Sequence, residues 1–287
     1  MERLQAIALP LLGDRRVVRA RAVFDRYNAA GGGLLAAGIA YNTLFALVPM
    51  VLFAGGLLGF FVSDPAGQES VKELLIGWVP QLAGVVDEVL DGLSAASPSV
   101  SIVGLVGIVW GATRLFASLE EGIAATFADA PTRSLVARTL RRFSSIVVIA
   151  VVIGGSFVAS SVASFAAELV PHGLDVAAVL FNLVLLVLPV LLTTLAIGVV
   201  YRFMPPVRPD LGSIVQPAVV VGVSLVVLTR LLAVVAPRVL GTSFVFGTLG
   251  TIFVALGWLA LAYSLVLIGS AWVRERMLDE EPTAAVA

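Results

Sequence analysis

The stretch AGIAYNTLFALVPM, residues 37–50, lies inside a run of residues 34–62 that contains no charge. A transmembrane helix needs roughly 20 mainly apolar residues, so this run is long enough to cross a membrane. It also carries Tyr41 and Asn42 side by side, with Pro49 seven residues after the asparagine. Because unpaired polar groups are costly in hydrocarbon, other parts of the protein or water must bond to them.

The composition is that of an integral membrane protein. The 287 residues are 59% hydrophobic and 13% charged, and the mean hydropathy is +1.05. Soluble domains have about a quarter of their residues charged. The chain has no cysteine, which excludes disulfides, thiolate catalysis and metal sites built on cysteine.

Six segments are long and apolar enough to span a membrane. We therefore predict an all-α, polytopic membrane protein with a six-helix transmembrane domain over residues 34–273. The domain follows an N-terminal segment, residues 1–33, and precedes a tail, residues 274–287. The predicted spans are residues 34–62, 100–118, 144–169, 176–201, 214–235 and 249–273.

The distribution of basic residues predicts the orientation, because arginine and lysine concentrate in cytoplasmic connections. The three connections predicted to lie outside, residues 63–99, 170–175 and 236–248, hold only Lys72 and Arg238. We predict that both termini are cytoplasmic. The arginines on the cytoplasmic side are Arg3, Arg15, Arg16, Arg19, Arg21, Arg26, Arg133, Arg138, Arg141, Arg142, Arg202, Arg208, Arg274 and Arg276.

Two amphipathic segments accompany the first span. In residues 1–33, apolar side chains such as Val17 and Phe24 alternate with arginines, which indicates an interfacial helix attracted to anionic lipid; the alternative is that these charges only set the topology. Residues 63–99 place apolar side chains at helical spacing between acidic ones. This outer segment is either a lid over a cavity or a cover for the helix ends.

The sequence offers little for catalysis. His172 is the only histidine, and no Gly-x-Ser-x-Gly elbow presents a serine. Glu120 and Glu121 are adjacent, so on a helix they point about 100° apart and cannot face each other as a pair. We predict that the protein is not an enzyme and uses no metal and no cofactor.

Two arginines fall within predicted spans. Arg114 lies near the cytoplasmic end of the second span and Arg230 near the outer end of the fifth. Each can reach the interface by snorkelling. The alternative is an internal cation that binds an anionic head group or pairs with an acid such as Glu120 or Glu121.

Four stretches resemble the YihY/BrkB family of bacterial inner-membrane proteins, in order along nearly the whole chain. They are AGIAYNTLFALVPM, RLFASLEEGIAATFADAPTRS, VVYRFMPPVRPDLGSIVQPAVVVG and FVFGTLGTIFVALGWLALAYSLVLIGSAW. Asn42 departs from the first motif, where another aromatic or small polar residue is expected. The resemblance implies a multi-pass protein of the bacterial inner membrane that functions in the cell envelope. It carries over no catalytic residue.

An internal similarity joins YNTLFALVP at residues 41–49 to FNLVLLVLP at residues 181–189. With opposite predicted directions, the first and fourth spans are candidates for an inverted repeat, as in many transporters; coincidence in a Leu- and Val-rich chain is the alternative. In a repeat, Tyr41, Asn42 and Asn182 would face one central polar cavity, flanked by Pro49 and Pro189.

Two functions from different classes fit these features. The first is transport of a lipid or other amphiphile through a central cavity, and the second is a non-catalytic scaffold for envelope integrity or assembly. The expected partners are membrane lipids, with a lipid or amphiphile as substrate and no nucleic acid; the sequence does not indicate an oligomeric state. Candidate cavity residues are Tyr41, Asn42, Pro49, Asn182, Pro189, Arg114 and Arg230.

Overall fold

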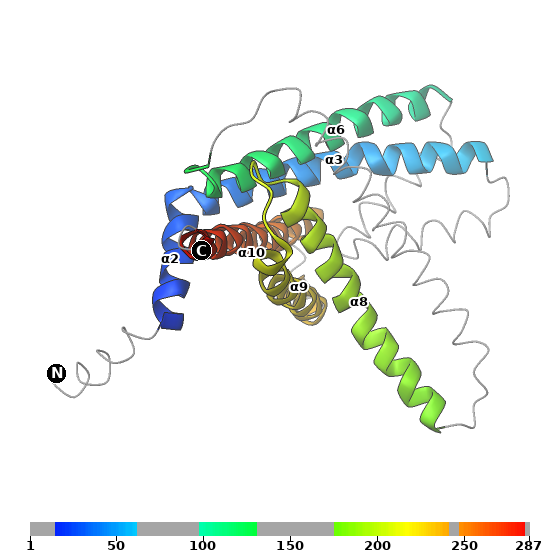
Figure 1. Ribbon diagram of the computed structural model, residues 1–287. Helices are drawn as coiled ribbons and strands as arrows, with labels where there is room; N and C mark the ends of the chain where they lie inside the picture. The colour runs from blue at the N-terminus through cyan, green and yellow to red at the C-terminus, as the bar shows by residue number, and fades with distance from the viewer. Residues whose placement is uncertain (1–14, 62–97, 131–174, 241–246, 285–287) are drawn as a thin grey trace, which may run out of the picture. The chain divides into compact units, whose positions relative to one another are not determined.

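The computed structural model describes residues 15–61, 98–130, 175–240 and 247–284, and all regular secondary structure in these ranges is helical. Figure 1 shows the helices with their labels. They are α2 (Arg15–Ala29), α3 (Gly32–Phe61), α6 (Pro98–Thr126), α8 (Asp175–Phe203), α9 (Leu211–Leu240) and α10 (Gly247–Ala284).

Five of the six predicted spans overlap α3, α6, α8, α9 and α10, although α6 continues to Thr126 and α10 to Ala284, well past the predicted ends at residues 118 and 273. The remaining span, residues 144–169, lies outside the described residues, as do the outer segment 63–99 and His172. Counted on the described residues alone, two helices are long and apolar enough to cross a membrane, Leu211–Val235 and Gly250–Glu280. A third is added if the bent pair Val17–Ala29 and Gly32–Ala46 forms one span. The six-span count and the orientation stay predictions.

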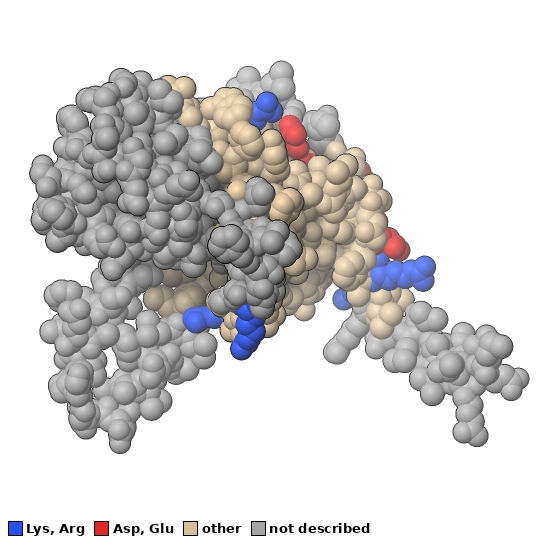
Figure 2. Space-filling model, turned by 180° about the vertical axis from the view of Figure 1, so that it is seen from behind, with Lys and Arg blue, Asp and Glu red and all other residues tan. Residues whose placement is uncertain are grey.

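The outward faces of the described helices are mostly apolar. On α9, exposed side chains recur at every fourth position at Val215, Val219, Val223, Val227 and Leu231, which places them along one stripe of the helix. Figure 2 shows the described surface from one side as mostly uncharged, with charged side chains in a few small groups. An apolar stripe of this kind suits contact with lipid.

The chain divides into two compact units, which we describe separately. The first comprises residues 1–32, 122–227 and 265–287, and the second comprises residues 33–121 and 228–264. The predicted division into an N-terminal segment, a transmembrane domain and a tail follows membrane topology instead, and it stays a prediction.

Tyr201 belongs to the buried core of the first unit. Its side chain is fully buried, and its hydroxyl donates a hydrogen bond of 2.8 Å to the carbonyl of Val266 on α10. A Cβ atom added at Gly269 would overlap the Tyr201 hydroxyl. Two stretches that carry the family resemblance, the end of α8 and the middle of α10, therefore meet here, and the glycine makes room for the tyrosine.

The turn between α8 and α9 is fixed by proline and aspartate. Pro205 and Pro209 are fully buried, and proline cannot continue a helix because it lacks an amide hydrogen. The Asp210 carboxylate then accepts a hydrogen bond of 3.1 Å from the backbone amide of Gly212, which caps the first turn of α9. The prolines thus end α8, and the aspartate caps the start of α9.

In the second unit α3 and α6 run antiparallel, side by side (Figure 1). Their backbones approach closely at one point, since a Cβ atom on Gly111 would lie 2.9 Å from the Cα atom of Ala46. Small residues permit such close packing between membrane helices. On α3, the Thr43 hydroxyl donates to the carbonyl of Ile39 and accepts from the Tyr263 hydroxyl on α10, both at 2.8 Å.

Candidate functional site

A pocket of about 350 Å³ lies next to the close approach of α3 and α6. Tyr41, Phe45 and Trp110 supply its aromatic surface, and Asn42 and Arg114 supply side-chain polar groups. Tyr41 and Phe45 are one helical turn apart, so they share a face of α3, and their ring centroids are 4.9 Å apart. Gly111, without a side chain, completes the lining.

Arg114 is the one charged residue among the described residues of this lining. Its guanidinium carbon lies 5.7 Å from the centre of the Trp110 ring, one turn earlier on α6, which is within the range of a cation–π interaction. No ion pair of Arg114 occurs among the residues that the structure describes. The positive charge is therefore oriented by an aromatic ring and is not neutralised by a described carboxylate.

The pocket combines an apolar surface with hydrogen-bond donors. The three rings are about half exposed, at 54% for Tyr41, 50% for Phe45 and 53% for Trp110. The Tyr41 hydroxyl, the Asn42 amide and the Arg114 guanidinium all can donate hydrogen bonds. Among the residues that the structure describes, neither a carboxylate nor a histidine lines the pocket. This arrangement suits the binding of an amphiphile.

The structure thus brings together three of the candidate residues, Tyr41, Asn42 and Arg114. Pro189 is half-buried inside α8, and Arg230 is exposed on α9. The remaining candidates, Pro49 in α3 and Asn182 in α8, have side chains outside the described set. A polar region shared by Asn42 and Asn182, and the inverted repeat with it, stay predictions.

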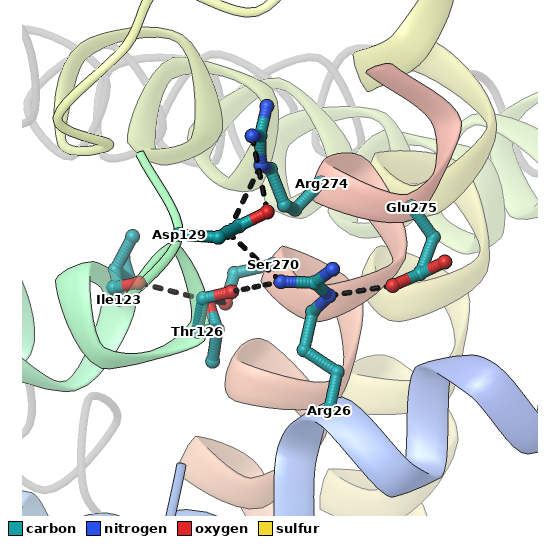
Figure 3. A network of polar contacts seen from close by, with 7 residues as sticks. All are labelled: Arg26, Ile123, Thr126, Asp129, Ser270, Arg274 and Glu275. Carbon is teal, nitrogen blue, oxygen red and sulfur yellow. Dashed lines mark hydrogen bonds and ion pairs between the residues drawn. The ribbon is translucent and has the colours of Figure 1, made fainter. Parts of the chain in front are cut away.

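A second polar group of side chains lies in the first unit, and Figure 3 shows it at close range. Asp129, just after α6, accepts from Arg26 of α2 at 3.0 Å and from Arg274 of α10 at 3.1 Å. Arg26 also pairs with Glu275 at 2.6 Å. We call these four residues the charge network. It ties together three helices that are far apart in sequence.

Burial and charge set the properties of the network. Arg274 is only 7% exposed, and its guanidinium lies 6.0 Å from the Phe127 ring. Burial alone would raise the pKa of the Asp129 carboxyl, but the hydrogen bond from Arg274 and the charges of Arg26 and Arg274 outweigh it, so that pKa is lowered. Asp129 therefore stays ionised, as a carboxylate between two guanidinium groups should.

A hydroxyl pair lies beside the charge network. Thr126 and Ser270 are both fully buried, and their hydroxyl oxygens are 2.8 Å apart. Each hydroxyl also lies within hydrogen-bond distance of a carbonyl of its own helix, Ile123 for Thr126 and Leu267 for Ser270. Because each hydroxyl has one proton, one of them donates to its carbonyl and the other donates across to it. Buried polar groups that are all paired in this way fix one packing of α6 against α10.

The sequence reasoning missed this network, because it interpreted Arg26 as a topology signal or as part of a helix attracted to anionic lipid, and Arg274 only as a topology signal. One signal pointed to it. Asp129 belongs to the stretch after the second span that resembles the family, and Ser270 belongs to the stretch at the last span. An acidic residue in the first stretch and a serine in the second mark both stretches as polar, although one sequence does not show that they meet.

The apolar helices and the stripe of exposed valines on α9 are those of an all-α membrane protein. The sequence profile of the family described as virulence factor BrkB matches residues 23–286. The chain belongs to this family, as the four resembling stretches predicted.

Similar proteins carry the name UPF0761 membrane protein. One from Rhodospirillum rubrum is 26% identical over 84% of this chain and 54% of its own length. Another from Aeromonas salmonicida is 23% identical over 88% of this chain and 86% of its own length. The chain thus spans about half of the first relative and most of the second. No solved structure is significantly similar to this chain.

Proposed function

We propose that this membrane protein binds a lipid or a related amphiphile in the pocket between α3 and α6 and moves it across the bacterial inner membrane. The observation that carries the proposal is the lining of that pocket, where three half-exposed aromatic rings meet the polar groups of Asn42 and Arg114. An amphiphile has the same two parts, an apolar chain and a polar head. The similarity to proteins named as membrane proteins supports the location.

The pocket also favours handling of small molecules over a purely structural role. A scaffold that only stabilises other membrane proteins needs packed helices and has no use for an open pocket. Here the rings of Tyr41 and Trp110 remain about half exposed, although apolar packing could have covered them. The chain has no P-loop of the Gly-x-x-x-x-Gly-Lys-Ser/Thr type, so movement would draw on an ion gradient or on the concentration gradient of the lipid itself.

The test is reconstitution of the purified protein in liposomes that contain a trace of fluorescently labelled lipid. A membrane-impermeant quencher added outside reports how fast label leaves the inner leaflet. We expect faster movement with the protein than in protein-free liposomes, and loss of this gain in Asn42→Leu. Gly38→Ala is the matched control on α3, because a Cβ atom there meets no atom within 4 Å. A rate equal to that of protein-free liposomes for every labelled lipid would favour the scaffold.

A further inference from the structure

We infer that the ligand of the α3–α6 pocket carries an anionic head group, which Arg114 binds while its guanidinium rests on the Trp110 ring. The inference rests on the proposed function and specifies its ligand. It goes further because it predicts discrimination between lipids that differ only in head-group charge.

The side chains of the pocket supply hydrogen-bond donors in excess. Arginine has five N–H donors and no acceptor, and its planar group fits the oxygens of a phosphate or carboxylate in pairs. The Asn42 amide and the Tyr41 hydroxyl add donors on the opposite helix. No carboxylate occurs among the described lining residues, so the one formal charge that they present to an anion is the positive charge of Arg114.

The Trp110 ring gives this arginine a defined direction. A flexible arginine loses side-chain entropy when it binds a ligand. Contact with an aromatic face holds the guanidinium in place before the ligand arrives, so less entropy is lost on binding. Arg230 provides the contrast within the same unit. It is also an exposed arginine in a predicted span, but it does not line the pocket. If each arginine only extended to the membrane interface, neither would be expected to line the pocket, but Arg114 does.

The same lining disfavours a choline head group. Three aromatic rings can form a cage for a quaternary ammonium, but here the guanidinium of Arg114 shares the pocket and repels a second cation. The volume of about 350 Å³ lies near the lower end of the roughly 300–1,000 Å³ typical of ligand pockets. It therefore suits a head group, with the acyl chains lying outside along the exposed rings.

The experiment measures binding directly, with the full chain in an uncharged detergent and native mass spectrometry as the readout. The probes are dihexanoyl phosphatidylglycerol, dihexanoyl phosphatidylcholine and sn-glycerol 3-phosphate. We expect the wild-type protein to prefer phosphatidylglycerol over phosphatidylcholine by about tenfold, as one charge-assisted hydrogen-bonded contact gives. Arg114→Gln should reduce this preference to near parity. Arg230→Gln should leave it unchanged.

Three outcomes would overturn the inference. They are equal binding of the two lipids by the wild-type protein, an unchanged preference in Arg114→Gln, and competition by sn-glycerol 3-phosphate as strong as that by phosphatidylglycerol, which would indicate a site for free phosphate esters. If Arg114→Gln does not fold, Arg114→Lys serves instead. It keeps the charge but loses the paired geometry, so we expect a preference between parity and that of the wild type. Selective binding without lipid movement in liposomes would refute only the proposed function.

Discussion

Arg274 and Asp129, which are 145 positions apart in the chain, form a two-pronged contact. The Nη2 atom of Arg274 lies 3.1 Å from one carboxylate oxygen, and its Nε atom lies 3.3 Å from the other. Because Arg274 is almost fully buried, Asp129 is the group that balances its charge. Asp129 also bonds to Arg26, so one carboxylate serves two arginines.

Replacing this carboxylate should therefore destabilise the first unit. We expect Asp129→Asn to lower the free energy of unfolding by about 1–2 kcal/mol, because a buried arginine loses its countercharge while partial exposure of Asp129 limits the loss. The measurement is thermal unfolding of the purified protein in detergent. Asp25→Asn is the control, since Asp25 pairs with Arg21 at 3.7 Å with both side chains largely exposed. An equal loss in both variants would contradict a special role for Asp129.

The charge network should also make stability depend on pH. The pKa of Asp129 is lower in the folded protein than its ordinary value, which is about 3.9 in an unfolded chain. Its contribution to stability is then fully present above about pH 4 and is lost as pH falls through the lowered folded pKa. We expect the melting temperature of the wild-type protein to fall more steeply than that of Asp129→Asn between about pH 5 and pH 3. Parallel curves would show that other carboxylates determine the acid sensitivity.

The close approach of α3 and α6 should not tolerate a side chain. In Gly111→Ala the new methyl group would lie 2.9 Å from the Cα atom of Ala46, so the helices must move apart, at a cost of about 1–3 kcal/mol. We expect a lower melting temperature together with weaker binding of dihexanoyl phosphatidylglycerol, because the pocket borders this contact. The control Gly38→Ala has open space around the new methyl. It should leave binding unchanged and keep or slightly raise the melting temperature.

The helices and part of the pocket could be predicted from the sequence, because both leave local signals. Charge-free runs predicted the positions of α3 and α8, and polar residues in an apolar run singled out Asn42. Contacts between distant segments leave no such signal. The Thr126–Ser270 pair, the charge network and the crossing at Gly111 join residues far apart in the chain, and one sequence does not tell which distant residues meet. Trp110 and Phe45 were missed for another reason, because an aromatic residue in a membrane span is ordinary until its neighbours are known.

The hydrogen bond between Thr43 and Tyr263 in the second unit should contribute to stability without affecting the pocket. Tyr263 and Thr43 share a hydrogen bond of 2.8 Å between α10 and α3, and neither residue lines the pocket. Tyr263→Phe removes this bond and keeps the ring, so we expect a loss of about 0.5–1 kcal/mol, the usual scale of interhelical hydrogen bonds in membranes. Thermal unfolding measures this loss. Binding of dihexanoyl phosphatidylglycerol should equal that of the wild-type protein, and a changed affinity would mean that the pocket extends to this bond.

Substitution of Asn42 distinguishes a role in transport from a role in holding the helices together. Its side chain is half-buried and lines the pocket beside Tyr41, so Asn42→Leu removes hydrogen-bonding capacity and keeps a similar volume. If Asn42 contacts the moving head group, the variant should unfold at the wild-type temperature yet fail to accelerate lipid movement in liposomes. If Asn42 only ties helices together, the variant should instead lose about 1 kcal/mol of stability and retain its activity. Thr43→Val is the neighbouring control, expected to lower the melting temperature through the lost bond to Tyr263 and to leave lipid movement intact. We expect the two variants to show opposite patterns, because Asn42 lines the pocket and Thr43 holds the helices around it.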